Sequence, residues 1–113
     1  MVWRFWTRKQ QRSAQVWIDE VLDEENLSNL KPLVEGVLER FCNARARIPN
    51  NEKQAYLAAA IIIASKFEED EAWLDPSDML EYYAGPMRLE DYKKQLIRLE
   101  REVLRVIQWK ITK

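Results

Sequence analysis

Residues 56–70 read YLAAAIIIASKFEED, and this stretch decides the fold. Its first nine residues are apolar, whereas Ser65, Lys66 and the acidic residues after Phe67 are polar or charged. A helix that is apolar on all of its faces is enclosed by its neighbours at the centre of a bundle. We therefore expect a rigidly held central helix that carries Lys66 at one end of the bundle, as part of a recognition surface.

Amphipathic segments on either side of this stretch predict four further helices. The clearest runs from Leu30 to Cys42, where apolar residues recur at helical spacing. Asp75 followed by Pro76 is a cap and first-turn pair, and the last segment has an apolar stripe that Ile97 widens. The sequence thus predicts an all-α, five-helix bundle around a buried central helix. The expected helices, with ends good to about two to four residues, cover residues 13–24, 29–43, 51–69, 76–84 and 89–107.

Length and charge limit the possible organisation. A chain of 113 residues forms one domain. Its 18 basic and 19 acidic residues give a net charge of −1, so no overall field attracts nucleic acid or an anionic membrane. Only residues 1–12 are lopsided, with four basic and three large aromatic residues and no acid. We divide the chain into this arm and a single domain over residues 13–113. The arm's aromatics either pack onto the bundle, which is the commoner case, or help it grip a phosphate backbone or membrane surface.

The residue types oppose catalysis. The chain has no histidine, only two glycines and one cysteine, Cys42, which lies on an apolar helical stripe. General-base chemistry, metal ligation and a glycine-rich phosphate loop are therefore not expected, and Cys42 is expected to pack in the core. We expect a binding protein without cofactor or metal. The single cysteine, the lack of a membrane-length apolar run and the lack of a signal peptide favour an intracellular protein of the nucleus or cytoplasm.

Four short stretches, in order, resemble the cyclin box. They are ERF at residues 39–41, ASKFEE at 64–69, the segment 76–83, and KKQLIRLE at 93–100 followed by Val103, Leu104 and WKI at 109–111. Each match is weak alone, but their order and spacing make the resemblance strong over about residues 12–111. The resemblance implies a cyclin-box fold and a regulatory subunit that binds and activates a cyclin-dependent protein kinase.

In that family, the lysine and glutamate that match Lys66 and Glu100 reach backbone groups beside the movable C-helix of the kinase, and apolar neighbours pack against this helix. The resemblance implies a monomer before kinase binding. The implied kinase-binding residues are Ile63, Lys66, Phe67, Glu69, Glu100, Leu104 and Ile111.

The chain also departs from the family. Most members carry a second cyclin box, so this chain is either a fragment or a single-box protein. Many members have an apolar groove that recruits substrates; Trp17, Glu20 and Gln54 match groove positions, whereas its Met, Ile and Leu are replaced by Gln10, Ser13 and Ala14. A shift of one residue, which matches Ile18 to the groove tryptophan, is the other alignment. Either alignment removes much of the apolar floor and counts against substrate recruitment there.

Other interpretations stay open. Lys66 alone is typical of a helix C-terminus, and Glu100 alone is typical of a solvated pairing with Arg101 or Lys94. The cyclin fold also occurs in transcription factors that bind DNA, for which Arg45, Arg47 and the N-terminal arm are candidates. A non-kinase adaptor is the third class. The net charge of −1 counts against nucleic acid as a partner.

Overall fold

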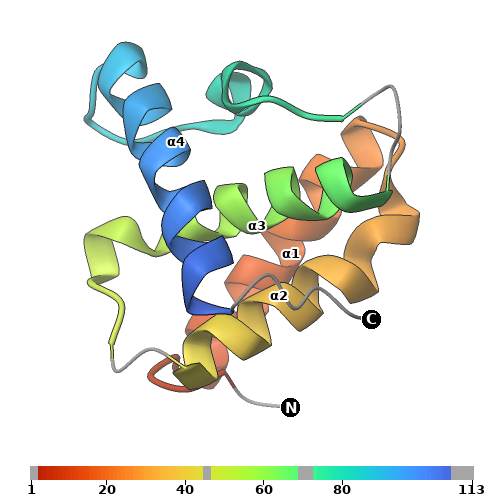
Figure 1. Cartoon of the computed structure of the whole chain (residues 1–113), viewed down its shortest axis with the longest axis vertical. Helices are drawn as coiled ribbons and strands as arrows, with labels where there is room; N and C mark the ends of the chain where they lie inside the picture. The colour runs from red at the N-terminus through yellow and green to blue at the C-terminus, as the bar shows by residue number, and fades with distance from the viewer. Residues whose placement is uncertain (1–2, 45–46, 69–72, 108–113) are drawn as a thin grey trace.

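The computed structural model describes residues 3–44, 47–68 and 73–107, which form helices and no strand (Figure 1). The five predicted helices correspond to α1, α2, α3, η3 and α4, so the all-α prediction is confirmed. Two additional 3₁₀ turns precede α2 and α3. In chain order the elements are α1 (Arg8–Glu24), η1 (Ser28–Leu30), α2 (Lys31–Ala44), η2 (Asn50–Glu52), α3 (Lys53–Glu68), η3 (Pro76–Tyr82) and α4 (Leu89–Val106).

The helix α3 is the centre of the bundle. It contacts α1, α2 and α4, and Figure 1 shows it running across the middle of the molecule with α4 crossing it. Every residue from 55 to 65 is buried. Ala59, Ala60, Ile62 and Ala64 are fully buried, as expected, and the small alanine side chains let neighbouring backbones approach closely. Packing along almost the whole length of α3 therefore fixes the position of its C-terminal end.

The start of α1 differs from the prediction. The helix begins at Arg8, five residues earlier than expected, so residues 8–12 are helical. The reason is a capping box: the Thr7 hydroxyl accepts from the Gln10 N–H at 3.0 Å, and the Gln10 side chain accepts from the Thr7 N–H at 3.0 Å. Trp3 and Trp6 are buried, with their rings edge to face at 5.2 Å, so these two aromatics pack onto the bundle.

The element η3 is a 3₁₀ helix where an ordinary short helix was expected. Asp75 is the N-cap residue and Pro76 opens the helix, as the sequence predicts, and the Asp75 N–H donates to Asp78 Oδ2 at 2.7 Å. After η3, the ring of Tyr83 stacks on that of Tyr92 in α4, with centroids 3.9 Å apart. This ring contact packs the segment after η3 against α4.

Candidate protein-interaction site

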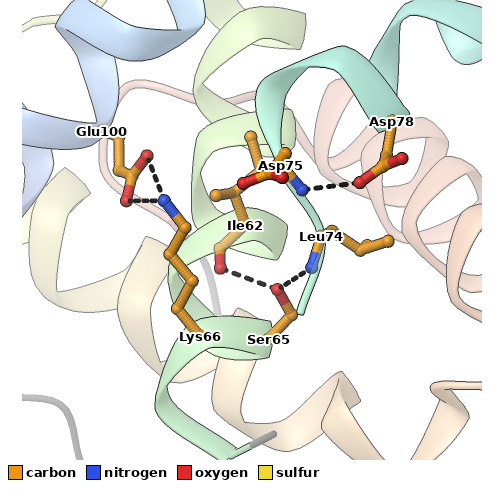
Figure 2. A network of polar contacts seen from close by, with 7 residues as sticks. All are labelled: Ile62, Ser65, Lys66, Leu74, Asp75, Asp78 and Glu100. Carbon is orange, nitrogen blue, oxygen red and sulfur yellow. Dashed lines mark hydrogen bonds and ion pairs between the residues drawn. The ribbon is translucent and has the colours of Figure 1, made fainter. Parts of the chain in front are cut away.

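Lys66 and Glu100 meet where the last turn of α3 passes α4. The ammonium group of Lys66 lies 3.0 Å from Glu100 Oε2 and 3.2 Å from Oε1 (Figure 2). The lysine side chain is 37% exposed and that of the glutamate 15%. The structure thus brings together the two residues that the resemblance singled out. Glu100 pairs across helices with Lys66, not with Arg101 or Lys94 on its own helix.

Ser65, directly before Lys66, builds the site from the inside. Its side chain is fully buried; the hydroxyl donates to the Ile62 carbonyl at 2.9 Å and accepts from the Leu74 N–H at 2.9 Å. Figure 2 shows Ser65 between these two residues, with Lys66 reaching to the other side toward Glu100. Ser65 therefore anchors the chain that leads into η3. The next residue, Lys66, presents its charge at the surface.

A depression of about 490 Å³ surrounds the ion pair. It is formed by the end of α3, the start of η3 and the middle of α4, and it combines charges of both signs with apolar surface. Its lining residues are Lys66, Asp75, Pro76, Ser77, Lys93, Ile97, Glu100, Arg101 and Leu104. Such a mixture of fixed charge and apolar area suits recognition of a protein surface.

The other residues of the implied kinase-binding set are placed differently. Phe67 is 55% exposed, whereas Leu104 is almost buried at the edge of the depression. Ile63 is only 2% exposed, so it supports the surface from beneath and offers a partner little area. Glu69 and Ile111 lie outside the described residues.

Sequence reasoning missed part of this surface. Ile97 was expected to widen the buried stripe of the last helix, but it is 40% exposed and lines the depression. The sequence did place Ile97 at the border of the apolar stripe of the last helix, which is where a partly exposed residue can occur. Asp75 and Pro76 were expected only to cap and open a helix. Their place beside Lys66 depends on the bond from Leu74 to Ser65, which local sequence does not reveal.

The residues that match the family's docking groove are divided. Trp17 and Gln54 line a groove of about 480 Å³ between α1 and the start of α3, together with Gln10, Ser13 and Ala14. Glu20 instead lines a separate depression with Asp19, Asp23 and Lys31. Ile18 is fully buried, which favours the alignment that matches Trp17 to the groove tryptophan.

Cys42 is a core residue, as predicted. Burial raises the pKa of its thiol to about 11, although neighbouring Trp6 and Lys53 act in the opposite direction. A thiol with such a pKa is a poor nucleophile near neutral pH. Within residues 3–44, 47–68 and 73–107, no group of three or more potential metal ligands is found. Of the helices in these ranges, none is long and apolar enough to span a membrane.

The fold is an all-helical domain in which Lys66 and Glu100 form a charged pair beside a depression between α3, η3 and α4. Comparison with protein families agrees: the family described as "Cyclin, N-terminal domain" matches residues 6–112. The chain therefore belongs to the cyclin N-terminal domain family, whose members are regulatory proteins. Comparisons with curated proteins and with solved structures found no significant match.

Proposed function

We propose that this cyclin-family domain binds and activates a cyclin-dependent protein kinase by docking on its C-helix, in the nucleus or cytoplasm. The observation that carries the proposal is the Lys66–Glu100 pair. It joins the end of the central helix to α4 at a depression with exposed apolar residues beside it. Family membership supplies the class of partner.

The pair has unused capacity for hydrogen bonds. An ammonium group has three donors and a carboxylate about four acceptor positions, while the two groups use only part of these on each other. Their side chains are already held by a packed helix and by mutual attraction. A partner that bonds to both therefore immobilises little additional side-chain freedom on binding. We infer that Lys66 donates to backbone carbonyl groups of the kinase and that Glu100 accepts from backbone N–H groups.

Apolar residues beside the pair supply contact area. Phe67 and Ile97 are large apolar side chains that remain substantially exposed in the free protein. A few buried aromatic or apolar anchors commonly dominate the energy of an interface. We therefore expect Phe67 to be the main apolar contact with the kinase. Leu104, at the edge of the depression, is expected to pack against the kinase C-helix.

Activation follows from selective binding. Kinase chemistry requires an ion pair between the C-helix glutamate and the catalytic lysine, which forms only when the C-helix is swung in. A regulator shifts this equilibrium by the difference between its affinities for the two states. The rigid end of α3 suits this task because it does not adapt equally well to the swung-out helix.

The proposal is tested by titrating Lys66→Ala and Glu100→Ala against a cyclin-dependent kinase, followed by a kinase assay. Loss of a charged hydrogen bond at a desolvated contact weakens binding about ten- to a hundredfold. We expect each variant to lose that much affinity and a matching share of activation. Because both residues grip one partner element, the double variant should lose less than the sum of the two singles.

Two controls isolate recognition from general effects of charge. Arg88→Ala removes a cation outside the depression. Lys31→Ala breaks an ion pair of similar geometry, between Lys31 and Asp19 at 2.9 Å, that joins α2 to α1. Both controls should bind like the parent. If both site variants bind and activate the kinase like the parent, the proposal is wrong, and the chain shares only the fold of the family.

A nucleic-acid-binding module is the alternative with a specific observation behind it. Four exposed basic residues form one stripe along α4, at Lys94, Arg98, Arg101 and Arg105, and line a depression of about 510 Å³. Of the residues suggested from the sequence, Arg45 lies outside the described residues, while Arg47 is exposed and has contacts of its own. Phosphate binding predicts a steep loss of affinity with salt, and Arg101→Glu and Arg105→Glu should abolish it. Kinase binding through Lys66 and Glu100 predicts a shallow salt dependence.

A further inference from the structure

The exposed face of α1 carries an ordered pattern of charge. Exposed residues follow one another at every fourth position along this helix, first two basic ones, then an apolar one, then two acidic ones. They are Arg8, Arg12, Val16, Glu20 and Glu24, and together they are called the α1 face. Val16, in the middle, is 51% exposed. None of these residues lines the groove between α1 and α3, so the α1 face is a separate surface.

The charges of the α1 face do not stabilise α1 itself. Cations near the start of a helix and acids near its end are opposite to the preference of the helix dipole, and α1 has no acidic residue in its first turn and no basic residue in its last. Arg8 and Arg12 are like charges four residues apart, as are Glu20 and Glu24, and such pairs repel each other on a helix. Within the described residues none of the four has an ion-pair partner. A charge pattern that disfavours its own helix points to a use in contact with another molecule.

The α1 face is complementary to itself. Two copies of the helix can lie antiparallel with Val16 opposite Val16. In this register Arg12 of each copy comes opposite Glu20 of the other, and Arg8 comes opposite Glu24 in the same way. The two helix dipoles then oppose each other, and the acidic end of each helix lies beside the electropositive start of its partner. A parallel arrangement in register would instead set like charges against one another.

We propose that the α1 face binds the α1 face of a second copy of this chain, as an antiparallel, two-fold symmetric pair of helices. A symmetric dimer uses the same patch on both subunits, so the patch must be self-complementary. The contact is at most about 25 Å long and consists mainly of exposed charges. We therefore expect a weak, salt-sensitive dimer with a Kd on the order of 0.1–1 mM. At micromolar concentration the chain is then a monomer.

This inference does not depend on the proposed kinase site. No residue of α1 lines the depression around Lys66, so the two surfaces are changed by different substitutions. The dimer is measured on the chain alone, without a kinase. Failure of one proposal is therefore distinguishable from failure of the other.

Translational diffusion of the full chain, measured by NMR between about 0.05 and 1 mM protein, provides the test. In low salt the parent should diffuse more slowly as its concentration rises, because dimers form. Salt at about 1 M shortens the screening length to about 3 Å and should remove most of this effect.

Charge-reversal variants locate the contact. Arg8→Glu with Arg12→Glu makes all four charges of the α1 face acidic, and the Kd should rise at least about tenfold. Glu20→Lys with Glu24→Lys makes them all basic and should have the same effect. An equimolar mixture of these two variants should dimerise again, and so should a single chain that carries all four substitutions. Both changes agree with the helix dipole, so each variant should fold at least as stably as the parent, which separates lost association from lost structure.

A control variant separates the α1 face from net charge. Arg88→Glu with Arg105→Glu makes the same change in net charge as the acidic variant, at exposed positions outside α1, and should leave dimerisation nearly unchanged. An effect of this control as large as that of the acidic variant would overturn the inference. So would a parent that stays monomeric at about 1 mM in low salt, or a mixture of the acidic and basic variants that stays monomeric. A monomeric parent that binds a single-stranded oligonucleotide through Arg8 and Arg12 would assign the basic half of the face to nucleic acid and overturn it as well.

Discussion

The two ends of α3 carry lysines in opposite situations. Lys53, at the first position of the helix, is almost buried, and within the described residues it contacts uncharged groups of the N-terminal turn and α1. Lys66, in the last turn, is partly exposed and paired with a carboxylate of α4. One helix thus presents an uncompensated charge at one end and a compensated one at the other.

This difference separates two uses of a charged side chain. Lys53 ties the turn around Phe5 to the central helix, so its loss affects the fold first. Lys66 contributes little to the fold, because an ion pair at this exposure is worth at most about 1 kcal/mol. A charge that is rigidly placed but structurally dispensable is available for recognition. The predictions below test this separation.

The largest difference is expected from the same substitution at both ends. Lys53→Glu would place a carboxylate against the Phe5 carbonyl, the Gln10 side-chain oxygen and the face of the Trp6 ring, all of which repel it. An uncompensated buried charge costs about 3–5 kcal/mol. Lys66→Glu places a carboxylate beside Glu100 at a partly exposed position and should cost about 1 kcal/mol. Urea unfolding of both variants measures the two values, and equal losses would remove the distinction between the ends.

Ser65→Ala should give the next largest effect. It removes the acceptor of the buried Leu74 N–H, and an unsatisfied buried donor costs about 1–3 kcal/mol. Ser13→Ala, at an exposed position of α1, is the matched control and should change stability little. The free energies of unfolding of both variants check this prediction. A loss no larger for Ser65→Ala than for the control would show that the serine does not hold the segment before η3.

Much of the fold follows from local sequence, because the all-apolar run at residues 56–64 and the helical spacing around it leave few other arrangements. The early start of α1 was missed although Thr7 and Gln10 have capping-box spacing. The pairing of Lys66 with Glu100 was approached only through the family resemblance, since it joins two helices. Two further features join segments that are distant in the sequence, so no local pattern predicts them. They are the bond from Leu74 to Ser65 and the contacts of Lys53 with the N-terminal turn.

Cys42 provides a test in the core near Lys53. Cys42→Ser buries a hydroxyl and should destabilise the protein by about 1–3 kcal/mol. Cys42→Ala should cost less and leave partner binding intact. Unfolding titrations and kinase binding of both variants check these expectations, and lost binding in a folded Cys42→Ala protein would contradict the core assignment.

The raised pKa of Cys42 predicts a pH dependence. In the unfolded chain the thiol ionises near its ordinary pKa of 9, whereas in the folded protein it keeps its proton up to about 11. The unfolded state therefore binds fewer protons between these values, so the stabilisation present below pH 9 is lost as pH rises toward 11. The parent should lose more stability than Cys42→Ala between pH 9 and pH 10, measured by urea unfolding. Parallel pH profiles would contradict the raised pKa.

The smallest effect is expected for Lys66→Ala on stability. The substitution breaks the ion pair with Glu100, but the loss should stay below about 1 kcal/mol, with unchanged helicity. Circular dichroism and a melting curve suffice to check this. A large loss of stability would make Lys66 a structural residue like Lys53.

The central claim is that Lys66 and Glu100 recognise a kinase and do not merely join two helices. The most direct measurement exchanges them, as Lys66→Glu with Glu100→Lys, and titrates the double variant against a cyclin-dependent kinase. The exchange keeps an ion pair between α3 and α4 but reverses the pattern of donors and acceptors that a partner meets. We predict a melting temperature close to that of the parent and at least about a tenfold loss of kinase affinity. Parent-like affinity in the exchanged variant would contradict the claim.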